Sequence, residues 1–315
     1  MALVSFRASR APERCGILAR MGSAAASSET DGDSRRILVA GCGYVGTCLA
    51  QQLAAGGSQV FALRRTPQPQ SHGIVSLCAD LTRIETLDVV PENLDAIVYA
   101  AGAGSSDEAA YRAAYLDGVQ NLVRSVADRA SALPRIIFCS STAVYGQERG
   151  EWVDEDSPVR PRRWNGELLL AAERLLRAHV AGSIVVRLGG IYGPGRTRLI
   201  DSVREGTARS RREPHFSNRI HRDDAAGVLA HLALTAAPEH DCYLGVDDEP
   251  ADDAEVLAFL AYQLGVRNPE VAEAGDAPAR RGGSKRCRNS RIRDAGYDFV
   301  FPSFRDGYIA MLGSR

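Results

Sequence analysis

One glycine-rich run constrains the fold more than any other feature of the sequence. Gly41, Gly43 and Gly46 follow a short apolar run and lead into a stretch whose apolar residues recur at helical spacing, which is the order strand, tight turn, helix. The first glycine permits the sharp turn, the second lets the backbone approach a pyrophosphate, and the third lets helix and strand pack closely. The free N–H groups of the first helical turn then face negative charge. The run predicts a dinucleotide site; the alternative is a glycine turn without a ligand.

Short apolar runs alternate with helical stretches along most of the remaining chain. Strands are expected at 36–41, 58–63, 74–78, 95–101, 135–140, 183–188 and 242–246. Helices are expected near 44–56, 108–130, 166–180, 198–206, 222–235 and 252–264. Such alternation predicts βαβ units and a parallel sheet with helices on both faces. The expected fold is therefore α/β, a Rossmann-type doubly wound parallel sheet with a small, mostly helical C-terminal substrate lobe.

These patterns divide the chain into parts. Residues 35–193 are expected to form the dinucleotide-binding core, which the chain rejoins at about 222–246, and residues 194–315 mainly the substrate lobe. Residues 1–34 are rich in Ala, Ser and Arg and poor in acids, and we expect them to be disordered. They are either a transit peptide for the plastid or the mitochondrial matrix, or an overlong start of a cytoplasmic protein that begins at Met21 or later.

Composition excludes several other classes of function. A net charge of −1 gives no general attraction to nucleic acid or membrane surfaces, and no apolar run reaches the length of a membrane span. The seven cysteines are scattered and include no Cys-x-x-Cys pair, which argues against a zinc site and for a reducing compartment. We expect no metal and a small-molecule substrate as the partner; a homodimer is left open.

The second expected strand ends on two arginines. An NAD-binding chain usually carries an Asp or Glu here for the ribose 2′-hydroxyl, whereas Arg64 and Arg65 would pair with a 2′-phosphate. We therefore expect NADP, with NAD and an ordinary solvated arginine pair as the alternative. Asp80 closes the third strand, where it is placed to accept from the adenine amino group. The expected cofactor-binding residues are Gly41, Gly43, Tyr44, Val45, Gly46, Arg64, Arg65, Asp80, Leu81, Ala100, Ala101, Gly102 and Ser140.

Several segments together carry a family resemblance. They are the glycine-rich run, Asp80-Leu81, the hydroxyl-rich run 140–146, the run 187–195 and the run 218–227. Over about residues 36–250 the chain resembles the extended short-chain dehydrogenase/reductases, the group of nucleotide-sugar epimerases and dehydratases. Within them it looks most like an atypical, YeeZ-like subgroup.

The resemblance implies a Tyr-x-x-x-Lys pair on the helix after the serine-containing strand. In the family, the tyrosine is the general acid/base and the lysine lowers its pKa. Aligning Glu173 with the family's helix glutamate puts Asn165 at the tyrosine position and Leu169 at the lysine position. No other register restores the pair, because Lys285 is the only lysine of the chain and no tyrosine stands four residues before it.

Other residues are candidates for the missing chemistry. Ser141 matches the family hydroxyl that orients a substrate carbonyl. Tyr192 offers a phenol after the sixth strand, with packing beneath the cofactor as the alternative. His221 could titrate near neutrality, with a buried structural histidine as the alternative. The catalytic candidates are therefore Ser141 and Tyr192.

Two functions of different classes follow. The first is an NADP-dependent oxidoreductase or epimerase/dehydratase-like enzyme with an unusual proton donor, acting on a small anionic or sugar-nucleotide-like substrate. The arginine-dense segment 265–295 is either a clamp for such an anion or a solvated surface. The second is a non-catalytic NADP(H)-binding sensor or scaffold. Ser141 and the substrate lobe favour the first function, and the missing pair favours the second.

Overall fold

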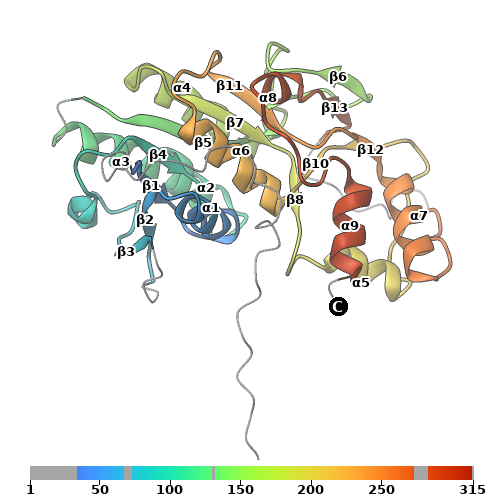
Figure 1. Cartoon of the computed structure of the whole chain (residues 1–315). Coiled ribbons are helices and arrows are strands. Elements are labelled where there is room, and N and C mark those ends of the chain that lie inside the picture. The colour runs from blue at the N-terminus through green and yellow to red at the C-terminus, as the bar shows by residue number, and fades with distance from the viewer. Residues whose placement is uncertain (1–33, 67–72, 130–131, 273–282, 314–315) are drawn as a thin grey trace, which may run out of the picture. The chain divides into compact units, whose positions relative to one another are not determined.

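Seven parallel strands form one sheet at the centre of the molecule (Figure 1). The computed structural model describes residues 34–66, 73–129, 132–272 and 283–313. The strand order is β11-β7-β5-β4-β1-β2-β3, so the winding reverses beside β1, which is the switch point of a doubly wound sheet. The strands are β1 Arg36–Ala40, β2 Gln59–Arg64, β3 Ile74–Cys78, β4 Ala96–Tyr99, β5 Arg135–Ser141, β7 Ile184–Leu188 and β11 Cys242–Gly245.

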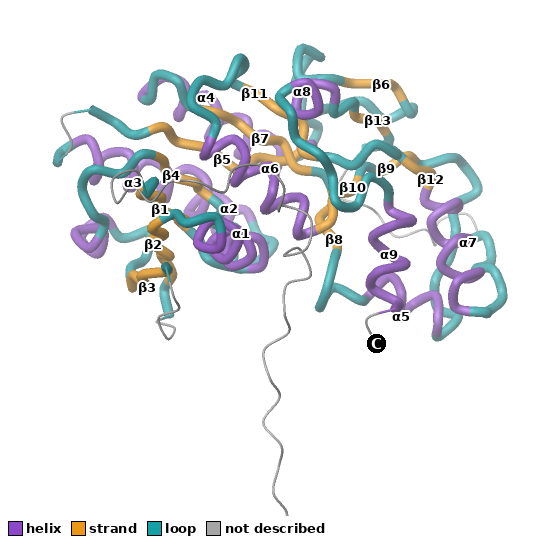
Figure 2. Tube along the Cα trace, in the orientation of Figure 1, coloured by secondary structure: helices purple, strands orange, loops and turns teal. Residues whose placement is uncertain are grey.

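The central strands are apolar on both faces because helices cover both. Every residue of β4 and β7 is buried. On one face, α1 (Tyr44–Ala55) packs against α6 (Arg222–Leu234), and α3 (Gly118–Ala127) packs with α4 (Trp164–His179) on the other. Figure 2 shows the strands as an inner layer between these helices. The predicted fold class is confirmed, and the seven predicted strands are the members of this sheet.

The helix predicted over 108–130 is interrupted. The structure has α2 (Glu108–Arg112), a π-helical turn η2 (Ala113–Asp117) and then α3. The Tyr99 hydroxyl reaches this turn from the end of β4 and donates to the Ala114 carbonyl. A Cβ on Gly118 would lie 2.3 Å from the Tyr99 hydroxyl oxygen. A side chain that inserts into the hydrogen-bond ladder of a helix widens the turn. A pattern of apolar residues carries no sign of such an insertion.

The C-terminal part builds a second, smaller core. We call α5 (Arg198–Arg204), α7 (Asp253–Leu264) and α9 (Phe304–Gly313) with their loops the C-terminal lobe; Ile200, Leu260 and Phe304 are fully buried in its core. The sequence pattern predicts neither α9 nor the shorter elements, which span too few residues for a readable period. These are η1 Ile84–Val89, η3 Thr142–Val144, β6 Glu151–Val153, β8 Gly190–Tyr192, β9 Phe216–Ser217, β10 Arg219–His221, β12 Ala251–Asp252, β13 Lys285–Cys287 and α8 Ser290–Asp294.

The predicted N-terminal extension lies outside the described residues except for Ser34, whose hydroxyl donates to the Gly57 carbonyl at 2.8 Å. From Ser34 onward the chain forms one compact unit. Within the ranges described, no helix is long and apolar enough to cross a membrane.

Candidate cofactor and active site

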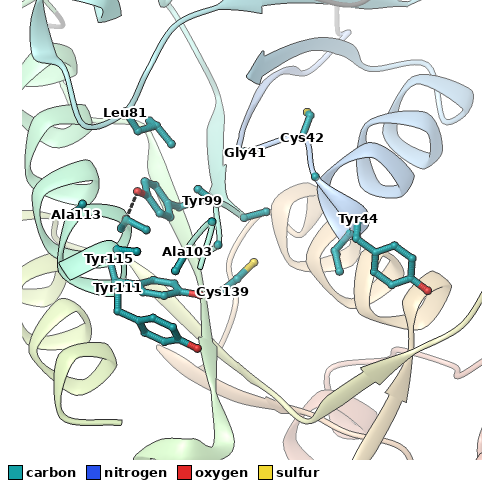
Figure 3. Close-up of a pocket in the computed structure, with 18 of the residues that line it drawn as sticks. Gly41, Cys42, Tyr44, Leu81, Tyr99, Ala103, Tyr111, Ala113, Tyr115 and Cys139 are labelled. Carbon is teal, nitrogen blue, oxygen red and sulfur yellow. Dashed lines mark hydrogen bonds between the residues drawn. The ribbon is translucent and has the colours of Figure 1, made fainter. Parts of the chain in front are cut away.

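A cavity of about 890 Å³ runs along the carboxyl edge of the sheet. Its walls come from the ends of six strands, β1 to β5 and β7, and from the beginnings of α1 and α4. Ligands of open α/β sheets bind at this edge, beside the switch point. In Figure 3, Gly41, Cys42 and Tyr44 lie on one side of the cavity and Tyr111 and Tyr115 on the other. Every predicted cofactor-binding residue except Gly46 lines the cavity, and so does Ser141.

The glycine-rich loop brings its backbone to the cavity. Gly41 has a φ of 101°, and its N–H and that of Cys42 both donate to the Leu63 carbonyl at 3.1 Å. Gly46 lies beneath the loop, where a Cβ would be 2.2 Å from the Gly41 carbonyl oxygen. A Cβ on Gly43 would meet nothing within 4 Å. Because the first turn of α1 carries no acidic side chain, its N–H groups can face an anion.

The two arginines after β2 have different surroundings. Nη2 of Arg64 donates to the Cys42 carbonyl at 2.8 Å and to the Thr47 hydroxyl at 3.1 Å, so this side chain also supports the glycine-rich loop. Arg65 is exposed on the cavity wall. Of the two, Arg65 is therefore the side chain whose charge can be changed without disturbing the loop.

Asp80 lies at the same end of the cavity. Its carboxylate accepts from the N–H of Thr82 at 3.0 Å and from the Thr82 hydroxyl at 2.8 Å. Partial burial raises the pKa of Asp80, but the Thr82 hydrogen bonds and the charge of Arg65 outweigh this and lower it. The group is thus an anionic acceptor at neutral pH, as hydrogen bonding to an amino group requires.

Ser140 lines the cavity, but its hydroxyl points away from it. The hydroxyl donates to Oε1 of Glu173 at 2.6 Å. Arg187 donates to both carboxylate oxygens of Glu173, at 3.1 and 2.8 Å, and to the Tyr145 hydroxyl at 2.8 Å. The side chains of Glu173 and Arg187 are 0% and 4% exposed. Burial lowers the pKa of Arg187, but Glu173 more than offsets this and raises it. This buried network holds the ends of β5 and β7 together, and the sequence alone gave Glu173 no such role.

Ser141 and the two positions of the expected pair line the cavity together. The Ser141 hydroxyl accepts from the Ala143 N–H at 3.2 Å, and Asn165 and Leu169 come from the beginning of α4. That helix starts against the turn after Ser141, since a Cβ on Gly166 would lie 2.4 Å from the Ala143 carbonyl oxygen. The cavity therefore carries an amide and an alkyl group where the resemblance implies a phenol and an ammonium.

An aromatic wall faces this end of the cavity. Tyr111 packs edge-on against Trp164 with ring centroids 5.0 Å apart, and lies 5.3 Å from Tyr115. Burial raises the pKa of Tyr115 and of the Cys139 thiol to about 12 each. Both groups are neutral at physiological pH. The sequence analysis missed Tyr111, Tyr115 and Cys139; the spacing of the two tyrosines, four residues apart, was the one available signal, and it is equally typical of core packing.

Tyr192 does not line the cavity. Its hydroxyl donates to the Ser303 carbonyl at 3.4 Å, and a Cβ on Gly307 of α9 would lie 2.0 Å from it. Burial raises its pKa well above that of a free phenol. The structure therefore turns this phenol toward the C-terminal lobe and gives no support to its expected role as proton donor.

His221 is also turned away from the cavity. Its Nδ1 accepts from the Asp223 N–H at 3.3 Å and caps the beginning of α6. Burial lowers its pKa to about 4, against the opposite effect of the Asp223 charge. This placement favours the structural interpretation of the histidine.

Several described arginines of the C-terminal segment make contacts within the protein. Arg291 pairs with Asp156, Arg293 pairs with Asp248, and Arg286 stacks on Trp152 at 5.0 Å. None of the described residues from 283 to 295 lines the cavity. This supports the surface interpretation of the segment over an anion clamp. Arg196, which the sequence analysis did not single out, lines the cavity instead.

Comparison with known proteins fits this geometry. The model of the NAD dependent epimerase/dehydratase family matches residues 37–232. The chain belongs to this family. The chain is 29% identical to Protein YeeZ of Escherichia coli, over 85% of this chain and 97% of YeeZ. It is also 29% identical to a 3-diazoavenalumate denitrifying reductase of a Streptomyces species, over 86% of this chain and 98% of that one.

Solved structures agree. A candidate NAD-dependent epimerase/dehydratase from Methylobacillus flagellatus is 34% identical, covers 90% of this chain and 99% of its own, and superposes with a TM-score of 0.73. The chain is thus an atypical extended short-chain dehydrogenase/reductase, and its family is NAD(P)-dependent. The open space at Gly43 and the acid-free beginning of α1 fit a dinucleotide in this cavity.

Proposed function

We propose that the protein binds NADP(H) in this cavity and transfers hydride between the cofactor and a small substrate held beside Ser141 and Asn165. The observation that supports NADP over NAD is the arginine pair at the end of β2, where Arg64 and Arg65 line the cavity and no carboxylate follows the strand. The bound cofactor would supply or accept the hydride. Binding and orienting the substrate fall to side chains of this chain.

Ser141 and Asn165 have the chemistry to hold a substrate carbonyl or hydroxyl. A serine hydroxyl can donate one hydrogen bond, and an asparagine amide both donates and accepts. Neither is an acid near neutral pH, so we propose that these residues orient the substrate while the proton comes from water. The aromatic wall of Tyr111 and Tyr115 gives the substrate an apolar surface to pack against. The relatives include an enzyme named as a reductase, which supports hydride transfer rather than a purely structural role.

A second candidate, an NADP(H) sensor without chemistry, is favoured by one observation. Asn165 and Leu169, which the sequence register puts at the positions of the usual acid/base pair, both line the cavity. The first function remains the better supported of the two because Ser141 still faces the cavity.

Calorimetric titration with NADPH and NADH tests the cofactor. We expect NADPH to bind at least about tenfold more tightly, because a guanidinium pairs strongly with a phosphate. Arg65→Ala should weaken the binding of NADPH alone. Arg64→Ala should weaken the binding of both cofactors, because this side chain also supports the glycine-rich loop. Arg83→Ala is the matched control, an exposed arginine nearby that pairs with Glu85. Equal affinities for the two cofactors in the unmodified protein would refute the proposed preference.

Turnover then separates the two functions. With carbonyl substrates screened in the presence of NADPH, Ser141→Ala is expected to reduce turnover by about ten- to a thousandfold while cofactor binding is kept. Tyr192→Phe is expected to change turnover much less, because its hydroxyl faces Ser303. Cofactor binding without turnover of any substrate would favour the sensor.

A further inference from the structure

A short segment of the chain reaches from β8 to the glycine-rich loop. We call residues 193–197, between β8 and α5, the strap. The Tyr44 hydroxyl, at the beginning of α1, donates to the Pro194 carbonyl of the strap at 2.9 Å. The guanidinium carbon of Arg196 lies 4.0 Å from the centroid of the Tyr44 ring. The strap therefore contacts the part of the cavity wall at which the first turn of α1 begins.

The conformation of the strap holds Arg196 in place. Gly193 and Gly195 have φ values of 141° and 82°, which favour glycine, and the Arg196 N–H donates to the Gly193 carbonyl at 3.0 Å. Nη1 of Arg196 donates to the Ile191 carbonyl at 2.9 Å. A Cβ on Gly193 would lie 3.0 Å from the Tyr44 hydroxyl, so a side chain there would push the strap away. The guanidinium is thus fixed by the Ile191 carbonyl and by the face of the Tyr44 ring.

Charge distinguishes Arg196 from its neighbour. Arg222 also faces the Tyr44 ring, at 5.5 Å, but it pairs with Asp223 at 2.8 Å. Arg196 lines the cavity, is exposed, and forms no ion pair with any carboxylate in the described part of the chain. This uncompensated guanidinium lies against the ring of Tyr44, the first residue of a helix without acids in its first turn, which makes this a place for an anion.

We propose that Arg196 binds the pyrophosphate of the cofactor and that the strap thereby ties the C-terminal lobe to the bound dinucleotide. The proposal rests on the proposed function, since it requires the dinucleotide in this cavity. The glycine-rich loop would contact the pyrophosphate through backbone N–H groups, and Arg196 would supply the countercharge from the opposite side. Arg196 is in this view a positioning residue: it aligns cofactor and lobe and takes no part in the hydride transfer.

Fragment binding tests the assignment on the whole protein. NADPH, NADH and ADP-ribose all carry the pyrophosphate. We expect Arg196→Ala to reduce the affinity for each of them by about five- to thirtyfold. Binding of 2′-AMP, which lacks it, should be unchanged. Arg198→Ala, which removes an exposed arginine two residues further along, is the matched control and should change none of these affinities. The loss in Arg196→Ala should shrink at 0.5 M salt, because salt screens an exposed charge.

The outcomes separate the two proposals. If the unmodified protein binds neither NADPH nor ADP-ribose, the proposed function fails and the role of Arg196 with it. If it binds both and Arg196→Ala binds ADP-ribose equally well, only the role of Arg196 is overturned. The anion could instead belong to the substrate: weaker binding of inorganic pyrophosphate to the NADPH-saturated variant, with unchanged ADP-ribose binding, would show this and refute the assignment to the cofactor.

Discussion

Replacing either of two glycines of the glycine-rich loop by alanine should have different effects: one variant should lose cofactor affinity, and the other should lose stability. In Gly43→Ala the new methyl group has no neighbour within 4 Å in the protein, so the fold should tolerate it. In Gly46→Ala the methyl group would lie 2.2 Å from the Gly41 carbonyl oxygen and 3.3 Å from a Val39 methyl, so the helix must move away from the strand. The first variant therefore tests the ligand site and the second tests the packing beneath it.

The magnitudes follow from these contacts. Gly43→Ala should change the free energy of unfolding by no more than about 1 kcal/mol, because a gain from the stiffer unfolded chain opposes a less favourable backbone conformation. Its methyl group would separate the loop from the pyrophosphate, and losing one hydrogen bond to a charged group costs about 1.5–3 kcal/mol, or about ten- to 150-fold in affinity. Gly46→Ala should lose about 1–3 kcal/mol of stability or more, as overpacked sites do.

Urea unfolding and calorimetric titration with NADPH measure the two effects on the same samples. We expect Gly43→Ala to keep its unfolding midpoint and lose affinity, and Gly46→Ala to lose stability. If Gly43→Ala bound NADPH as tightly as the unmodified protein, the pyrophosphate could not lie against this loop, and the placement of the cofactor would be wrong.

Two further predictions concern buried ionisable groups. Glu173→Leu should destabilise the protein by about 3–5 kcal/mol in urea unfolding, because it leaves Arg187 charged and buried. Adding Arg187→Met should restore most of the lost stability. If Glu173→Leu alone were as stable as the unmodified protein, this prediction would be wrong. The pKa of His221 is lowered to about 4 from an ordinary value of 6.5, so below pH 6.5 the unfolded chain binds a proton that the folded protein does not. The His221 contribution to stability is therefore complete above pH 6.5 and falls by about 2–3 kcal/mol toward pH 4. His221→Asn keeps a capping acceptor and does not titrate, so its stability should fall less over this range, and equal slopes for the two proteins would count against the burial argument.

The sheet and the residues at its carboxyl edge could be predicted because each depends on local sequence. A parallel strand buried on both faces is a short apolar run between polar turns, and seven such runs are readable in this chain. Parallel strands also fix where their carboxyl ends lie. Once Gly41, Asp80, Gly102 and Ser141 each lie at the end of a predicted strand, the fold must gather them at one edge, and all four line the cavity.

Side-chain direction could not be predicted in the same way. Ser140 and Ser141 are adjacent, yet one hydroxyl turns to the buried Glu173 and the other stays at the cavity. The direction of the Ser140 hydroxyl depends on Glu173, which lies on α4, 33 residues further along the chain. Arg187 holds the Glu173 carboxylate where it can accept from Ser140. Tyr192 is a similar case, since α9 covers its hydroxyl and the sequence pattern predicts no helix there. Arg196 was missed because its position depends on the strap reaching Tyr44, a contact between residues 150 positions apart along the chain.

The cavity has a charge pattern that bears on both proposed functions. Among the described residues, its charged lining consists of Arg64, Arg65, Asp80 and Arg196, at the part where the dinucleotide phosphates and adenine are proposed to lie. Around Ser141 the described lining is neutral: an amide, alkyl groups, a thiol and phenols, with the thiol and one phenol held neutral by a pKa of about 12. A neutral site can bind and orient a substrate, but it cannot move a proton quickly at pH 7. Hydride transfer here is therefore best suited to substrates whose product takes its proton from water. If the protein turns over none of these substrates but binds NADPH, the sensor function is favoured.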